Sequence, residues 1–248
     1  MRRSVQGLLI AASAAFIAFS AFQPELATPL KIEKGTHISL IGGNLGSRML
    51  NYDYFETEMQ LRYPDSQLYI RNMCDGGDTP GFRPHASRNN PWAFPGAEKF
   101  QTEYANKSAS EGFFDAPDQW LTRLKTDVVV GMFGYSESFQ GAAGVANFKA
   151  ELDAFIKHTL SQTYNGSAAP QLVLVSPIAF EDLSNLHDLP NGVKENANLQ
   201  LYTNAIKEVA TRNNLLFIDA FTPSKQWYAE SKEPLTIDGS QLTEDGYK

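Results

Sequence analysis

The hydrophobic positions along the chain fall into two alternating patterns. Short apolar runs bounded by Gly, Pro, Asn or Asp are typical of buried strands, whereas an apolar residue at every third or fourth position is typical of a helix that buries one face. The first pattern predicts strands at 36–41, 67–72, 127–133, 172–176 and 215–219. The second predicts helices at 47–63, 117–124, 145–162 and 198–211.

The segment 145–162 has the clearest helical pattern. Its apolar residues share one face and are Val145, Phe148, Leu152, Phe155, Ile156 and Leu160. Strands that alternate with helices of this length form right-handed βαβ units, so the sequence predicts an α/β fold with a parallel sheet of about five strands. In such sheets the functional residues lie in loops that follow the carboxyl ends of the strands.

A long polar segment at 75–115 interrupts this alternation. It is rich in Gly, Pro and Asn, and its aromatic residues include Trp92, Phe94, Phe100, Tyr104, Phe113 and Phe114. A long insertion at the site end of a sheet commonly shapes a binding cleft, and aromatic rings beside amides suit sugar stacking. The alternative interpretation is a loop that packs its own aromatic residues.

Composition narrows the range of functions. The chain has 248 residues, which suits one α/β domain, and a net charge of −7 without a basic cluster beyond its first residues, which argues against binding nucleic acid. Its single cysteine, Cys74, rules out an internal disulfide framework, a Cys-rich metal site and a c-type haem motif. The sequence has no metal-binding motif and no nucleotide fingerprint, so we predict neither a metal nor a cofactor.

The N-terminus has the pattern of a targeting segment. A pair of arginines precedes an apolar run at 8–22, as in a secretory signal, and small residues near its end offer a cleavage site. We therefore expect a signal peptide at 1–22, a linker at 23–35 and one domain at 36–248. The protein is expected to be secreted or periplasmic, with the N-terminal segment as a membrane anchor if it is not cleaved.

The end of the chain carries the most specific motif. The residues from Asp238 to Thr243, Asp-Gly-Ser-Gln-Leu-Thr, resemble the closing motif of the SGNH (GDSL-type) hydrolases, Asp-x-x-His-Leu-Thr. In that family the Asp orients the His, which is the general base for a serine near the N-terminus. Gln241 stands where the family has the His, and an amide has no titratable nitrogen that takes the serine proton near neutral pH.

Two earlier loops resemble other blocks of the same family. Gly43 and Asn44 follow the first predicted strand, and Asn44 takes the position of the nucleophilic serine, with the N-cap of the following helix as its alternative role. After the third predicted strand, the segment 134–137, Gly-Tyr-Ser-Glu, resembles the family's Gly-x-Asn-Glu. Ser136 therefore replaces an Asn whose amide donates to the oxyanion.

The remaining block follows the second predicted strand and is the least regular. Cys74 takes the position of a glycine whose N–H enters the oxyanion hole, although Gly76 or Gly77 fills that role in a second alignment. The Cys74 thiol is also a candidate replacement nucleophile, or else the side chain is a small packed residue. Ser136 is a further candidate nucleophile.

The resemblance implies a three-layer α/β/α, flavodoxin-like sandwich and the positions of its site. The catalytic positions of the family fall on Asn44, Cys74, Ser136, Asp238 and Gln241. The neighbouring residues that we expect to contact a substrate or ligand are Gly43, Arg48, Asn72, Gly134 and Glu137. Flanking motifs resemble one branch of the family, found at the N-terminus of large secreted planctomycete and verrucomicrobial proteins, which implies further domains in the same polypeptide.

The loss of either the nucleophile or the base alone abolishes most of the activity of a catalytic triad, and both are replaced in this sequence. The sequence therefore predicts an extracytoplasmic, catalytically degenerate esterase-like domain that binds a small molecule or carbohydrate, or docks other domains. The alternative is an active esterase for acyl or acetylated-sugar esters, in which Cys74 or Ser136 is activated by His85 or His187. Thr243 and the acidic residues after it predict the cap of a final helix, most of which lies beyond the sequence.

Overall fold

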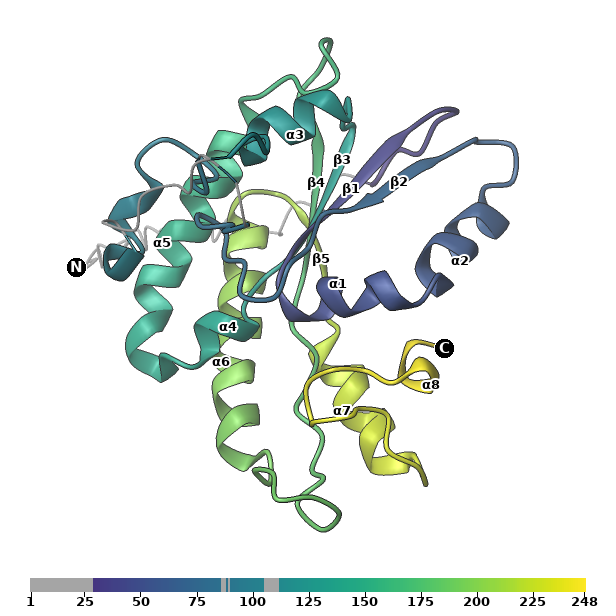
Figure 1. The fold of residues 1–248 in the computed structure, drawn as a ribbon, viewed down its shortest axis with the longest axis vertical. Coiled ribbons are helices and arrows are strands. Elements are labelled where there is room, and N and C mark those ends of the chain that lie inside the picture. Colours follow the sequence, from purple (N-terminus) through teal and green to yellow (C-terminus); the bar gives the residue numbers. More distant parts are fainter. Residues whose placement is uncertain (1–28, 86–87, 89, 105–111) are drawn as a thin grey trace, which may run out of the picture.

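A parallel sheet of five strands forms the centre of the structure (Figure 1), which is a computed structural model that describes residues 29–85, 88, 90–104 and 112–248. The strand order is β2-β1-β3-β4-β5, and every neighbouring pair is parallel. The strands are β1 (His37–Gly42), β2 (Tyr69–Asn72), β3 (Val128–Met132), β4 (Gln171–Val175) and β5 (Leu216–Ile218). The predicted parallel sheet is confirmed.

The two strands in the middle of the sheet, β1 and β3, are covered on both faces. Every residue of β3 is buried, and so is every residue of β1 after His37. Their register places Leu40 opposite Val130 and Gly42 opposite Met132. From β1 the chain goes first to β2 on one side and then to β3 on the other, so the strand order reverses between β1 and β3. A ligand crevice forms beyond the carboxyl ends of the strands at such a switch point.

Helices cover both faces of the sheet, which gives three layers (Figure 1). They are α1 (Asn44–Arg48), α2 (Tyr54–Arg62), α3 (Pro117–Arg123), α4 (Tyr135–Ser138), α5 (Gly141–Leu160), α6 (Val193–Arg212), α7 (Phe221–Glu230) and α8 (Glu244–Tyr247). Side chains of α3, α5 and α6 form one core with strand residues such as Ile41 and Leu174. On the opposite face, Leu45 of α1 and Phe55 of α2 pack against a second core that contains Ile38.

The helix predicted at 47–63 is interrupted in the structure. A short 3-10 turn (Met49–Asn51) follows α1, and α2 begins only at Tyr54. Tyr52 is extended between them, with φ −143° and ψ 130°. Its ring lies 5.3 Å from the ring of Tyr247, between centroids. A tertiary contact with the end of the chain therefore accompanies the break, which local spacing does not reveal.

Two helices, α4 and α7, have no counterpart among the predicted elements. α4 has only four residues, and α7 buries only Phe221 and Ser224, so neither shows a helical pattern of apolar residues. α5 and α6 begin at Gly141 and Val193, ahead of the predicted starts at 145 and 198. The predicted cap at Thr243 is confirmed, because its Oγ1 accepts the N–H of Gly246 at the start of α8.

The insertion at 75–115 packs several of its aromatic rings inward. Phe94 is buried, and Trp92 and Phe100 pack against the same core as α5. In contrast, Phe113 and Phe114 have exposed side chains. The structure therefore favours the packed interpretation for the first three rings, and none of these five rings lines a site for sugar stacking beside the predicted catalytic positions.

A buried carboxylate joins this insertion to α5. Glu151 Oε1 accepts hydrogen bonds from Thr79 Oγ1 at 3.0 Å, Gly81 N at 2.9 Å and Gln101 Nε2 at 3.1 Å. Gln101 Nε2 also lies 3.1 Å from Oε2 of the same carboxylate. Only 1% of Glu151 is exposed. We call this arrangement the Glu151 clamp. It ties two parts of the insertion to α5, and one residue of each part, Thr79 and Gln101, lines the cleft described below.

Residues ahead of β1 also pack on the sheet. Leu30 and Ile32 contact the core on the α2 side, and Lys31 N donates to Gln171 Oε1 at 2.7 Å. Packing therefore extends into the predicted linker at 23–35. The predicted signal peptide at 1–22 lies outside the described residues. Among the residues that the structure does describe, no helix has both the length and the apolar character needed to cross a membrane.

Candidate functional site

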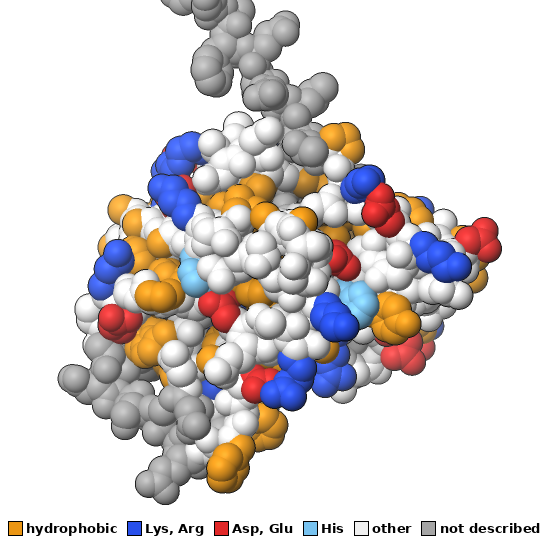
Figure 2. Space-filling model, turned by 90° about the horizontal axis from the view of Figure 1, so that it is seen from above, with side chains coloured by type: hydrophobic (Ala, Val, Ile, Leu, Met, Phe, Trp, Pro, Cys, Tyr) orange, Lys and Arg blue, Asp and Glu red, His pale blue; other side chains and the backbone are white. Residues whose placement is uncertain are grey.

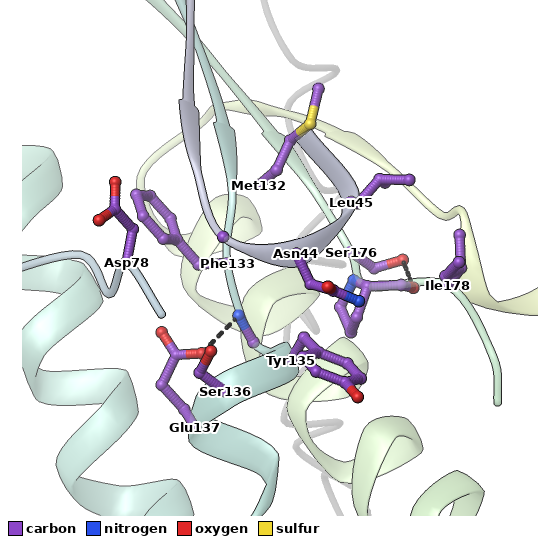
Figure 3. Close-up of a pocket in the computed structure, with 13 residues that line it drawn as sticks. Asn44, Leu45, Asp78, Met132, Phe133, Tyr135, Ser136, Glu137, Ser176 and Ile178 are labelled. Carbon is purple, nitrogen blue, oxygen red and sulfur yellow. Dashed lines mark hydrogen bonds between the residues drawn. The ribbon is translucent and has the colours of Figure 1, made fainter. Parts of the chain in front are cut away.

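A small pocket lies at the switch point between β1 and β3 (Figure 3). Gly43 N donates to Met132 O at 3.0 Å, which holds the loop after β1 against β3. Gly42 has φ +129°, and a Cβ there would lie 2.1 Å from Met132 O, so only glycine permits this approach. The pocket is lined by Gly43, Asn44, Leu45, Asp78, Met132, Phe133, Gly134, Tyr135, Ser136, Glu137, Ser176, Pro177 and Ile178.

The pocket is almost filled, and a larger cleft adjoins it. The free volume of the pocket is about 10 Å³, which is room for about one water molecule. The cleft has a volume of about 450 Å³ and shares Ser136 and Glu137 with the pocket. Its lining residues are Gly77, Thr79, Phe82, Pro84, Gln101, Glu103, Ser136, Glu137 and Gln140. A small organic ligand fits the cleft, whereas only a very small group fits the pocket.

Asn44 lies in the pocket, at the position predicted for the nucleophile. Its side-chain Nδ2 donates to the carbonyl oxygen of Ser240 at 3.0 Å. The alternative role as a helix N-cap is wrong, because Gly43 is the N-cap residue and Asn44 is already the first residue of α1. The structure therefore uses the Asn44 amide to join the loop after β1 to the closing motif of the chain.

The closing motif is a tight turn organised by Asp238. Asp238 Oδ1 accepts hydrogen bonds from Ser240 N at 2.9 Å, Ser240 Oγ at 3.0 Å and Gln241 N at 2.8 Å. The hydrogen bond between Asp238 and Gln241 thus uses the backbone N–H of Gln241. The buried Glu181 carboxylate holds the start of the same segment, accepting from Leu235 N at 3.0 Å and Thr236 N at 2.6 Å.

Five predicted site residues line neither the pocket nor the cleft: Asp238 and Gln241 of the closing turn, and Arg48, Asn72 and Cys74, which lie beside or behind α1. Asn72 Oδ1 accepts the Cys74 N–H at 2.9 Å, and Asn72 Nδ2 donates to Gly46 O at 2.7 Å. The Cys74 thiol is buried against Gly46, and burial raises its pKa. Arg48 donates through Nε to Leu242 O at 3.4 Å. The Cys74 N–H is therefore engaged, and its thiol is protonated at neutral pH.

The third loop places a buried carboxyl group between the pocket and the cleft. Gly134 has φ +104°, and its N–H donates to Glu137 Oε2 at 2.9 Å (Figure 3). Burial, together with the nearby Glu151 and Asp78 carboxyls, raises the pKa of Glu137 to about 8. Ser136 precedes Glu137 and borders both cavities. Gly134, Ser136 and Glu137 thus line the same pocket as Gly43 and Asn44.

Several pocket residues are absent from the sequence prediction. Asp78 is 3% exposed and follows β2, and burial raises its pKa well above the usual value. Ser176 follows β4 directly and is buried. Tyr135 lies between the two predicted residues Gly134 and Ser136, and its side chain interacts with Ser240. The rule that sites follow strand ends points to Ser176, whereas nothing local marks Asp78.

No histidine lines the pocket or the cleft. His158 Nε2 pairs with Asp118 at 2.6 Å, and His85 lies 4.7 Å from the Phe114 ring. His187 is exposed in the loop after β4. Within the described part of the chain, no group of three or more His, Cys, Asp or Glu side chains is arranged to hold a metal ion.

A second groove lies at the opposite end of the sheet, beside the amino ends of β1 and β2. Its volume is about 470 Å³, and its lining includes Arg71 and Lys125. His37 and Tyr69 stack there with ring centroids 4.5 Å apart, and His37 Nδ1 lies 2.6 Å from Leu124 O. Figure 2 views the molecule from this end, where basic side chains lie beside acidic ones. The groove is remote from every predicted catalytic position.

Comparisons with known proteins identify the fold. No protein-family model matches the sequence, and no curated protein matches it. An acetylxylan esterase from Geobacillus stearothermophilus has a similar structure, with a TM-score of 0.57 and 14% identity over 88% of this chain and 91% of that chain. Another variant of that enzyme, described as an acetyl-xylooligosaccharide esterase, gives a TM-score of 0.57 and 15% identity over the same shares.

A gut microbial diltiazem-metabolizing enzyme is similar as well. Its TM-score is 0.57 and its identity 13%, over 91% of this chain and 46% of that chain. At such low identity these similarities establish the fold alone. The chain therefore has an SGNH hydrolase-like fold, in agreement with the fold predicted from its motifs.

Proposed function

We propose that this domain is a catalytically degenerate SGNH-type esterase that binds a neutral, hydroxyl-rich ligand such as a carbohydrate in the cleft beside Ser136 and Glu137. The observation that carries the proposal is Asn44 at the nucleophile position, with its amide donated to Ser240 O at 3.0 Å. A carboxamide is not a nucleophile in acyl transfer, because its nitrogen lone pair is delocalised.

The similar acetylxylan esterase supports this assignment of positions. The catalytic variants of that enzyme change a serine, an aspartate and a histidine three positions after the aspartate. Asp238 and Gln241 have the same spacing here, which supports the assignment of Gln241 to the position of the base. Replacing both nucleophile and base leaves at most the weak assistance of the oxyanion site, since the triad acts as a unit.

The lining of the cleft supports the ligand class. Amides of Gln101 and Gln140 and hydroxyls of Thr79 and Ser136 border it, and these groups both donate and accept hydrogen bonds, as sugar hydroxyls do. The titratable residues of its lining, Glu103 and Glu137, are both acidic and none is basic, which disfavours anionic ligands. We further propose that the domain is extracytoplasmic and belongs to a longer polypeptide of the planctomycete and verrucomicrobial type, within which it binds ligand or docks other domains.

The test compares hydrolysis and binding in one preparation. Purified protein is assayed on short acyl esters and acetylated xylo-oligosaccharides beside a double variant, Asn44→Ser with Gln241→His. Cys74 is kept in both, because it packs against Gly46 and its removal opens a cavity. Binding of unacetylated xylotriose is measured by calorimetry.

We expect saturable binding of xylotriose and no turnover by the natural protein, with slow turnover only by the double variant. The variant Asn44→Ser alone is the matched control, because it supplies the hydroxyl without a base. Specific turnover by the natural protein contradicts the loss of catalysis. Absence of saturable binding contradicts the binding role.

A further inference from the structure

Glu137 occupies the wall between the pocket and the cleft, and half of its carboxyl group has no assigned role. Only 4% of the residue is exposed. Its Oε2 accepts the N–H of Gly134 at 2.9 Å. Its Oε1 is buried and has no hydrogen-bond partner among the described residues. Buried polar atoms are nearly always paired, so this unpaired oxygen, which belongs to a residue of the cleft lining, marks a place for a ligand atom.

The surroundings of this carboxyl group disfavour its charged form. Asp78 faces it from the loop after β2, Glu151 from α5 and the Tyr202 hydroxyl from α6. The Arg83 guanidinium lowers the pKa of the Asp78 carboxyl and so opposes part of the effect of its burial. Burial and the neighbouring acids raise the pKa of Glu137 to about 8, so the group is largely protonated at neutral pH.

The hydrogen bond to Gly134 decides which oxygen carries the proton. Because Oε2 accepts an N–H, it acts as the carbonyl oxygen of the neutral acid, and the proton is assigned to Oε1. The free oxygen is therefore a hydrogen-bond donor. A second carboxylic acid at the same wall, Asp78, also has an unpaired buried oxygen, Oδ1. Both acids line the pocket, and Glu137 also lines the cleft.

We infer that Glu137, in its uncharged form, donates a hydrogen bond from Oε1 to a hydroxyl oxygen of a sugar in the cleft, so that the site binds neutral sugars and releases its ligand in alkaline solution, acidic sugars most strongly. This inference rests on the proposed function and specifies how the same site selects its ligand. Ionisation of Glu137 replaces a donor by an acceptor and places a second negative charge beside any bound carboxylate. The two effects give the pH dependence and the selectivity a common cause.

The experiment measures calorimetric affinity at about pH 6 and about pH 9, using xylotriose as the neutral probe and trigalacturonic acid as the acidic one. With a pKa of about 8, roughly one-eleventh of Glu137 stays protonated at about pH 9, so xylotriose affinity falls roughly tenfold. Trigalacturonic acid loses more affinity than xylotriose over the same pH change, because ionised Glu137 also repels its carboxylates.

The variant Glu137→Gln separates this role from a structural one. Its amide oxygen accepts the Gly134 N–H and its NH₂ replaces the Oε1 donor, so the variant retains affinity at about pH 6 and loses the pH dependence. The matched control is Glu98→Gln, an exposed acid outside the cleft lining, which keeps the tenfold fall. Carboxyl ¹³C NMR of ligand-free protein identifies the Glu137 signal as the one missing from the variant, and its midpoint lies near pH 8.

Equal xylotriose affinity of the natural protein at both pH values overturns the inference and leaves the proposed function standing. A Glu137 midpoint below about pH 6 overturns it as well, whether or not a ligand binds. Failure of xylotriose to bind at either pH overturns the proposed function, and the inference with it.

Discussion

Replacing Glu151 by leucine tests whether the Glu151 clamp positions the cleft. The substitution keeps the size of the side chain close to that of Glu but removes both carboxylate oxygens. Three buried donor groups then lose their acceptor, those of Thr79, Gly81 and Gln101. The loss is confined to contacts between α5 and the insertion, because these donors all belong to the insertion.

The expected magnitude follows from those three donors. An unsatisfied buried donor costs about 1–3 kcal/mol, which gives about 3–9 kcal/mol for three. Burial raises the pKa of Glu151, so removing the carboxyl group also relieves a desolvation cost that offsets part of this sum. We therefore expect the free energy of unfolding to fall by about 3 kcal/mol or more.

The assay is urea unfolding followed by circular dichroism, together with amide hydrogen exchange across 79–101. Exchange in the insertion should accelerate more than exchange in β3. Glu151→Gln retains one acceptor oxygen and should lose only about 1 kcal/mol. Ala150→Leu, on the exposed side of the same helix, is the matched control and should change stability by less than about 0.5 kcal/mol.

The reasoning is refuted if Glu151→Leu unfolds within about 1 kcal/mol of the natural protein and the insertion exchanges at its natural rate. That result means that water or other groups satisfy the three donors, and that the insertion keeps its place without the carboxylate.

Three further predictions use other parts of the structure. Gly42→Ala forces a Cβ to 2.1 Å from Met132 O and should cost about 3 kcal/mol or more in thermal unfolding. Gly166→Ala, with φ +80° but open space around it, should cost only about 1 kcal/mol, and equal losses contradict the steric argument. The pKa of Glu137 is about 8 in the folded protein and 4.5 in its ordinary state, so the folded state binds more protons than the unfolded state. The contribution of Glu137 to the free energy of unfolding is therefore complete below about pH 4.5 and is lost as the pH rises to about 8. Between about pH 5.5 and 7.5 the natural protein should lose up to about 1.4 kcal/mol per pH unit relative to Glu137→Gln in urea unfolding, and a constant difference contradicts this. The Cys74 thiol, buried and of raised pKa, should react with a thiol reagent only after urea unfolds the protein, and rapid labelling of folded protein contradicts its placement.

The sequence predicts the inner strands β1, β3 and β4 well because each is an apolar run that the fold buries, whereas the edge strands β2 and β5 are partly exposed. Helix ends are less predictable. Ahead of α7, the Asp219 side chain accepts the Thr222 N–H at 2.9 Å, which is a local capping signal. The helix nevertheless exposes most of its residues, so it lacks the apolar spacing that identifies helices. Local pattern therefore identifies buried elements better than exposed ones.

The site was predictable where it follows a strand end. Gly43, Asn44, Gly134 and Ser136 all lie in the pocket because parallel strands bring their carboxyl ends together. Asp78 and the Glu151 clamp were not predictable, because they depend on the path of a long insertion across a distant helix. The side-chain directions of Asn72 and Cys74 also depend on tertiary packing, here against α1.

The hydrogen bond from Asn44 to Ser240 joins residues that are 196 positions apart in the chain. During synthesis β1 and α1 emerge first, and the turn at Asp238 emerges only when nearly all of this sequence has left the ribosome or crossed a translocation channel. The sheet and every residue that lines the pocket or the cleft therefore precede the partner of the Asn44 amide along the chain. The Asn44 side chain is therefore free to reorient in the partly made protein, and its amide gains this hydrogen-bond acceptor only once Ser240 has been made.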